Sequence, residues 1–179
     1  VAAMGKQGDV LPVNEPPPRF ADIAAIIEAG CKLPMPEVVS YGAGRALFYS
    51  ARINEVHGEP GQGKTWVGLY AAKSVMEEGK IVLYVDPEDT EPGIISRLLS
   101  MGVAPDVLVK FFKLVSQPEP LELPGIAAWA KAEHPALVVF DGLAEMLTSH
   151  GLSEIDPGEV LRFFRDVIRP YTLCGSAVL

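Results

Sequence analysis

The stretch Gly58-Glu59-Pro60-Gly61-Gln62-Gly63-Lys64-Thr65 is the strongest indication of fold in this chain of 179 residues. It matches the pattern G-x-x-x-x-G-K-[ST], in which a glycine-rich turn joins a strand to a helix. Glycine lets the backbone wrap closely around phosphate oxygens, and the successive N–H groups at the start of the helix supply positive potential. The pattern therefore predicts a phosphate-binding loop.

The predicted loop implies two cofactors, ATP and Mg²⁺. The Lys64 ammonium is expected to reach the β and γ phosphates, and the Thr65 hydroxyl is expected to ligate Mg²⁺. Trp66 follows on the predicted helix. We count it among the nucleotide-binding residues; the other interpretation is that its ring is a core or interface anchor. The residues expected to bind the nucleotide are Gly58, Glu59, Pro60, Gly61, Gln62, Gly63, Lys64, Thr65 and Trp66.

A second carboxylate position follows the apolar run at 137–140, which ends at Asp141. An aspartate at the end of a buried strand can hold Mg²⁺ opposite the loop hydroxyl, and we assign Asp141 this Walker B role beside Thr65. An acid at a strand end is also common as a helix cap. The phosphate-binding loop earlier in the chain favours the metal role.

A dense acidic segment at 86–91 follows the next predicted strand. The carboxyl ends of parallel strands face the ligand crevice, so acids placed there can act on a bound nucleotide. No acid directly follows Asp141, and we therefore expect the base that activates water to lie in this segment. Glu88 is our choice, with Asp86 and Asp89 as alternatives; the other interpretation is a solvated acidic turn that caps the next helix.

Apolar runs alternate with helical patterns from about residue 46 onward, which predicts an α/β fold with a mainly parallel sheet and three layers. Strands are expected at 47–57, 80–85, 107–115, 135–140 and 176–179, and helices at 65–78, 92–101, 123–133 and 157–173.

The first 36 residues hold six of the 16 prolines. Because proline blocks helix interiors, we interpret residues 1–45 as an arm, with residues 1–18 as a linker and one short helix at 20–29. Residues 46–179 form the predicted core. A last strand at 176–179 would ordinarily continue, so we expect a truncated core from a longer protein; a short last strand is the alternative.

Composition limits the partners. The chain carries 15 basic and 23 acidic residues, a net charge of −8, so a polyanion would have to be bound by a local group of residues rather than by a wholly basic surface.

Two distant cysteines without a CxxC pattern indicate reduced thiols and a cytoplasmic protein. The apolar runs are far shorter than the roughly 18 to 20 residues of a membrane-spanning helix, so no membrane partner is expected.

The motif order resembles one family, the RecA-like AAA ATPases of the RepA-type hexameric replicative helicase group, which is frequent in phages, plasmids and actinobacteria. The glycine-rich loop is followed by Y-V-D-P-E-D at 84–89, by R-L-L at 97–99 and by V-F-D-G-L-A-E at 139–145. The resemblance covers residues 45–179. It implies a RecA-like P-loop core, a water-activating acid at Glu88 and a Walker B aspartate at Asp141.

The resemblance also implies a homo-oligomeric ring or filament and, by resemblance only, single-stranded DNA as a partner. The chain ends before the sensor strand and DNA-contacting loops of that family.

We expect a Mg²⁺-dependent motor ATPase, a DNA helicase or recombination ATPase. The alternative is a nucleotide-dependent assembly or regulatory switch without nucleic acid, which the negative charge favours. A small-molecule kinase is disfavoured, because no arginine-rich lid is seen. Arg97 either reaches a neighbouring subunit's phosphate or is a surface arginine.

Overall fold

The structure, a computed structural model, describes residues 20–179 and divides the chain into two units, Val1–Leu33 and Pro34–Leu179. The linker predicted over 1–18 lies outside the described residues. Within the first unit, helix α1 (Ile23–Glu28) falls inside the helix predicted over 20–29. The Asp22 side chain caps it by accepting a hydrogen bond from the Ala25 N–H, and none of its residues is buried.

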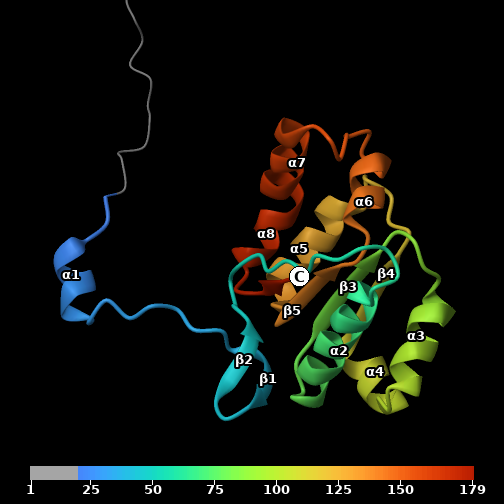
Figure 1. Cartoon of the computed structure of the whole chain (residues 1–179), viewed down its shortest axis with the longest axis horizontal. Coiled ribbons are helices and arrows are strands. Elements are labelled where there is room, and N and C mark those ends of the chain that lie inside the picture. Colours follow the sequence, from blue (N-terminus) through green and yellow to red (C-terminus); the bar gives the residue numbers. More distant parts are fainter. Residues whose placement is uncertain (1–19) are drawn as a thin grey trace, which may run out of the picture. The chain divides into compact units, whose positions relative to one another are not determined.

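A four-stranded parallel sheet forms the centre of the second unit (Figure 1). Its strands lie in the order β4 (Phe112–Ser116), β3 (Val82–Asp86), β5 (Leu137–Phe140), β6 (Ala177–Val178). Every neighbouring pair is parallel, with Val82 opposite both Phe112 and Leu137. The predicted α/β class with a mainly parallel sheet is therefore confirmed.

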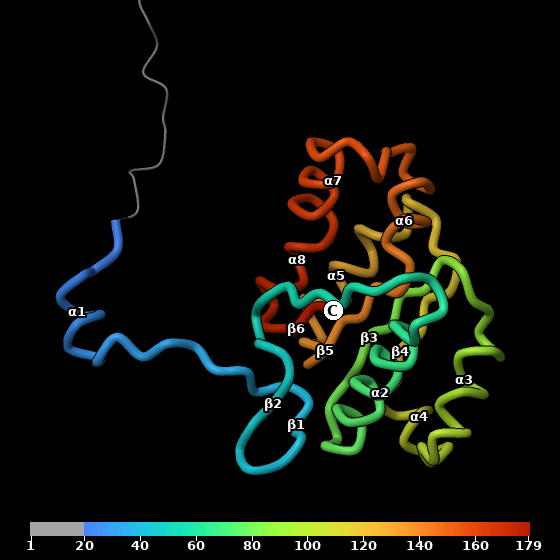
Figure 2. The backbone as a smooth tube through the Cα atoms, in the orientation of Figure 1, coloured from blue at the N-terminus to red at the C-terminus, as the bar shows by residue number. Residues whose placement is uncertain are grey.

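Helices cover both faces of this sheet, because its inner strand β3 is apolar on both sides. Val82 and Tyr84 point into one buried cluster, and Leu83 and Val85 point into the other. The first cluster is covered by α2 (Lys64–Glu77), α3 (Glu91–Ser100) and α4 (Pro105–Phe111). The second is covered by α5 (Leu123–Glu133), α6 (Leu143–Ser149), α7 (Pro157–Phe163) and α8 (Arg169–Thr172). In the backbone trace of Figure 2, the strands lie between these two groups of helices, which gives three layers.

The prediction of a strand over 47–57 is wrong beyond its first two residues, which belong to β2. The chain instead forms a separate antiparallel hairpin of β1 (Val38–Gly42) and β2 (Arg45–Phe48). The Asn54 side chain then folds the following segment into a turn, because its Oδ1 accepts from the Tyr49 N–H at 2.9 Å and its Nδ2 donates to the Tyr49 carbonyl at 3.0 Å. A parallel bridge between Ile53 and Val178 attaches this segment to the edge of the sheet, and the Asn54 N–H donates to the Val178 carbonyl at 2.7 Å.

The strand predicted over 107–115 is half wrong, because its first part is helix α4 and only its last part belongs to β4. Pro105 opens α4 and Asp106 lies in its first turn, which are favourable residues at a helix start. Leu108, buried on α4, packs into the first cluster.

The helix predicted over 157–173 is present, but it changes geometry in the middle. A π-helical segment, η1 (Phe164–Ile168), joins α7 to α8. Pro170 explains the change, since proline has no N–H and its ring conflicts with the carbonyl of Asp166 four residues earlier. No helix within residues 20–179 combines the length and apolar character needed to cross a membrane.

Candidate functional site

A cavity of about 930 Å³ lies at the carboxyl ends of β3 and β5, beside the start of α2. This is the edge of a parallel sheet at which ligands bind in α/β proteins. The cavity brings together segments that are far apart in the sequence: the glycine-rich loop, the acidic segment after β3 and the residues after β5. Its lining includes Gly58, Pro60, Gly61, Gly63, Lys64, Thr65, Trp66, Asp86, Glu88, Asp89, Arg97 and Asp141.

The loop before α2 is shaped for a ligand that accepts hydrogen bonds. Gly61 and Gly63 have φ of +78° and +90°, a conformation that glycine adopts without strain. Gly63 is the N-cap residue, and no side chain caps the first N–H groups of the helix. These N–H groups can therefore bind an anion in the cavity.

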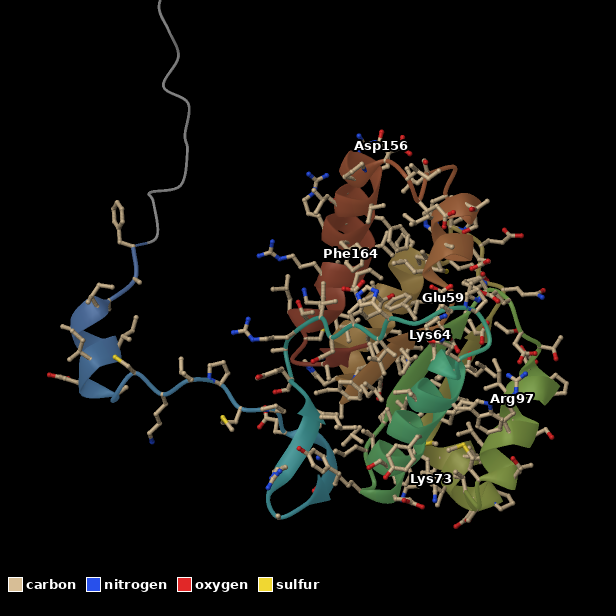
Figure 3. All side chains as sticks on the ribbon, in the orientation of Figure 1. Glu59, Lys64, Lys73, Arg97, Asp156 and Phe164 are labelled. Carbon is tan, nitrogen blue, oxygen red and sulfur yellow. The ribbon has the colours of Figure 1, made fainter. Side chains whose placement is uncertain are left out.

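Lys64 rests on the loop itself (Figure 3). Its Nζ donates to the carbonyl oxygens of Gly58 at 2.7 Å and Glu59 at 3.2 Å. Glu59 and Gln62 are not part of the cavity lining; instead Gln62 Oε1 accepts from the Glu59 N–H at 3.1 Å. These two residues fix the shape of the loop, and Lys64 is held within reach of the cavity.

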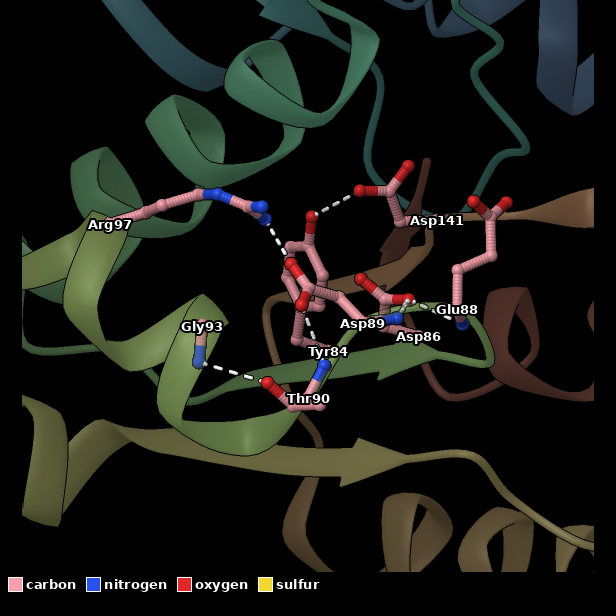
Figure 4. A network of polar contacts seen from close by, with 8 residues as sticks. All are labelled: Tyr84, Asp86, Glu88, Asp89, Thr90, Gly93, Arg97 and Asp141. Carbon is pink, nitrogen blue, oxygen red and sulfur yellow. Dashed lines mark hydrogen bonds and ion pairs between the residues drawn. The ribbon is translucent and has the colours of Figure 1, made fainter.

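The Tyr84 side chain positions the Asp141 carboxylate. The Tyr84 hydroxyl donates to Asp141 Oδ2 at 2.8 Å (Figure 4). Tyr84 is fully buried on β3, and this burial, reinforced by the charge of Asp141, raises the pKa of the phenol well above its ordinary value. The hydroxyl therefore remains a hydrogen-bond donor to the carboxylate.

Two of the three acids considered as general bases have other partners. Asp86 is buried, and its Oδ1 accepts from the N–H groups of Glu88 and Asp89 at 2.8 and 2.9 Å, which closes the turn after β3. Burial raises the pKa of Asp86, partly offset by those backbone hydrogen bonds. Asp89 forms an ion pair with Arg97 of α3. Arg97 thus has a partner within its own chain.

Glu88 faces a second carboxyl, that of Glu145 on α6. Hydrogen bonding with the Glu145 side chain, followed by some desolvation of the otherwise exposed carboxyl and the charges of Glu145, Asp86 and Asp141, raises the pKa of Glu88 to about 7. Such a pKa lets a carboxyl gain and lose a proton near neutral pH. Glu88 and Glu145 both line the cavity.

The donors in the cavity fit a magnesium ion. Thr65 and Asp141 offer one hydroxyl and one carboxylate, and no group of three or more histidine, cysteine or acidic side chains within residues 20–179 is arranged to hold a metal by itself. Mg²⁺ suits such a sparse set, because it keeps several waters and takes further ligands from phosphate oxygens.

Sequence reasoning missed the parts played by Tyr84 and Glu145. Tyr84 stands in a strand that is apolar on both sides, and a buried tyrosine hydroxyl usually has a hydrogen-bond partner. Glu145 lies four residues after Asp141, near enough on α6 to return to the same edge of the sheet. Neither signal identifies the partner residue, because Tyr84 pairs with Asp141 and Glu145 with Glu88, and each pair joins two different elements.

Comparisons with known proteins add no family to this description. No protein-family model matches the chain. No curated protein matches it at a significant level. The resemblance to RecA-like ATPases remains a prediction from the motifs quoted above.

Proposed function

We propose that this chain binds Mg-ATP in the cavity beside α2 and hydrolyses it as a RecA-like P-loop ATPase. One observation carries the proposal: Lys64, Asp141 and Glu88 line the same cavity although they lie on three separate segments. A cation, a metal-binding carboxylate and a carboxyl with a pKa near neutrality are the groups that phosphoryl transfer to water requires.

The phosphates are proposed to lie against the uncapped N–H groups of α2. Lys64 would exchange its carbonyl partners in the loop for the β and γ phosphate oxygens, a stronger, charge-assisted contact. Thr65 and Asp141 would hold the Mg²⁺, which when bound neutralises charge on the phosphate oxygens.

Glu88 is proposed to accept a proton from the attacking water. The water oxygen forms a bond to the γ phosphorus, the bond to the β–γ bridging oxygen breaks, and ADP and phosphate leave. Asp86 and Asp89 suit this role less well, because the first closes the turn after β3 and the second is paired with Arg97. An ionised Glu88 has no such cationic partner among the described contacts.

Steady-state ATP hydrolysis by matched variants tests this proposal. Lys64→Ala is expected to lower turnover at least about 100-fold, a loss typical of removing a group that stabilises developing charge. Lys73→Ala is the control, because Lys73 lies further along α2 and pairs with Glu77. Glu88→Gln is expected to retain ATP binding and lose turnover. Undiminished turnover in Lys64→Ala would contradict the proposal, and normal turnover in Glu88→Gln would remove the role of Glu88.

Coupling of hydrolysis to single-stranded DNA in a homo-oligomeric helicase or recombination motor is proposed on the motif resemblance alone. A regulatory or assembly switch is the second candidate, favoured by the net charge of −8. Turnover measured with and without single-stranded DNA distinguishes them. Stimulation that disappears in Lys64→Ala supports the motor, and turnover indifferent to DNA supports the switch.

A further inference from the structure

One buried hydroxyl group joins the three elements that carry the proposed metal site. Tyr84 lies on β3, donates to Asp141 after β5, and contacts α2 at Gly68. A Cβ on Gly68 would lie 3.2 Å from the Tyr84 hydroxyl oxygen and 3.3 Å from Val139 Cγ1. Gly68 is buried, and a side chain there would crowd both strands, so α2 packs closely on the sheet at this point.

The same helix face carries Thr65. Residues three apart in an α-helix lie on one face, so Gly68 and Thr65 are neighbours along α2. Gly68 contacts Tyr84, and Tyr84 in turn holds Asp141. The tyrosine thus lies between Asp141 and the part of α2 that follows Thr65.

The hydrogen bond to Asp141 is not a general requirement for burying a tyrosine in this chain. Tyr171 is also buried, 1% exposed, and its hydroxyl has no hydrogen-bond partner. Tyr84 differs because its hydroxyl is directed at Oδ2 of a half-buried carboxylate that lines the cavity.

We propose that Tyr84 is a positioning residue for the metal site: its hydroxyl fixes the Asp141 carboxylate and, through Gly68, the separation between Asp141 and Thr65. This inference rests on the proposed function. Fixing the rotamer of Asp141 before the ion arrives removes an ordering cost from binding, and such preorganisation strengthens metal affinity through residues that do not touch the metal.

The experiment measures ADP and ATP affinity by the fluorescence of Trp66, which lines the cavity, first in EDTA and then across a Mg²⁺ titration. The Trp66→Phe variant shows how much of the fluorescence change comes from Trp66 and how much from Trp129. Tyr84→Phe is expected to leave the affinity in EDTA within about twofold, to reduce the Mg²⁺-dependent gain in affinity several-fold, and to raise the Mg²⁺ concentration for half-maximal turnover. Saturating Mg²⁺ should restore most of kcat. Tyr171→Phe is the matched control, because it removes a hydroxyl that has no partner.

Gly68→Ala provides a second variant that retains the Tyr84 hydroxyl but displaces it. It is expected to show the same loss of Mg²⁺ dependence, and thermal unfolding in EDTA identifies any variant that has not folded. If Asp141→Asn loses the Mg²⁺-dependent gain while Tyr84→Phe and Gly68→Ala match the wild type, the positioning role is overturned and the proposed function stands. If the wild type binds no nucleotide, both proposals are overturned.

Discussion

Gly142 and Glu88 lie so close together that a Cβ on Gly142 would be 2.9 Å from Glu88 Oε1 and 3.0 Å from Pro87 Cγ. Gly142 also has φ of +109°, a conformation that other residues rarely adopt. Gly142→Ala is therefore expected to destabilise the fold by about 1–3 kcal/mol, the usual cost of such backbone strain, and to displace Glu88. Chemical denaturation and ATP turnover measure the two effects.

Gly125→Ala is the control for this change. Gly125 lies in α5, its φ is not in the positive range, and a Cβ there would meet nothing within 4 Å. Alanine is the better helix former by roughly 1 kcal/mol, so this variant should be more stable than the wild type. Wild-type turnover in Gly142→Ala would show that the position of Glu88 does not depend on this glycine.

The carboxyl pair of Glu88 and Glu145 predicts a pH dependence of turnover. Because the pKa of Glu88 is raised to about 7, the proposed base is protonated below that pH, and kcat/KM should fall as the pH falls through 7. Glu145→Gln removes the neighbouring negative charge, so the acid limb should move to lower pH. Glu133→Gln, on the exposed surface of α5, should leave the limb in place. An unchanged limb in Glu145→Gln would contradict this assignment.

The same pair has a consequence for stability in the nucleotide-free protein. The pKa of Glu88 is higher in the folded chain than its ordinary value of 4.5, so the folded state binds the proton more tightly than the unfolded state. The contribution of Glu88 to the free energy of unfolding is present below pH 4.5 and is lost as the pH rises through about 7. The difference between wild type and Glu88→Gln, measured by denaturation across this range, should show that slope.

Elements with strong local signals could be predicted from the sequence. Helix α5 has the predicted bounds 123–133, α2 begins one residue before its predicted start, and β5 lies within 135–140. Their limits are set by proline near the start of α5, by the glycine-rich loop before α2 and by a continuous apolar run in β5, which are all properties of neighbouring residues.

Elements that depend on distant partners could not be predicted in this way. The segment after β2 is folded by Asn54, whose Nδ2 also donates to the carbonyl of Val178, 124 residues later. In the site, the residue types at Lys64, Glu88 and Asp141 predict a nucleotide site, and the structure places all three in the lining of one cavity. The contacts of Tyr84 depend on how three elements pack, which no local pattern encodes.

Asn54 should therefore be important for stability although it lies in an irregular segment. Its side chain makes hydrogen bonds to the backbone of Tyr49, Arg52 and Val178. Asn54→Ala removes them at a partly buried position and should cost about 1–3 kcal/mol of unfolding free energy. Denaturation measures the loss, and hydrogen exchange should become faster at the Val178 N–H, which donates to the Arg52 carbonyl. A change below about 0.5 kcal/mol would show that the edge bridge at Ile53 holds this segment without the side chain.

The two buried tyrosines should respond differently to loss of the hydroxyl. Tyr84→Phe removes a hydrogen bond to a carboxylate that is partly exposed and can be rehydrated, so we expect a loss of about 1–2 kcal/mol. Tyr171→Phe removes a buried hydroxyl without a partner and keeps the ring packed edge-on against Phe140 at 5.4 Å. Because the unpartnered hydroxyl gives up its hydration on folding and gains nothing in return, Tyr171→Phe should be neutral or up to about 1 kcal/mol more stable. Denaturation of both variants in EDTA compares them without nucleotide or metal, and a destabilised Tyr171→Phe would mean that a water molecule bonds to that hydroxyl.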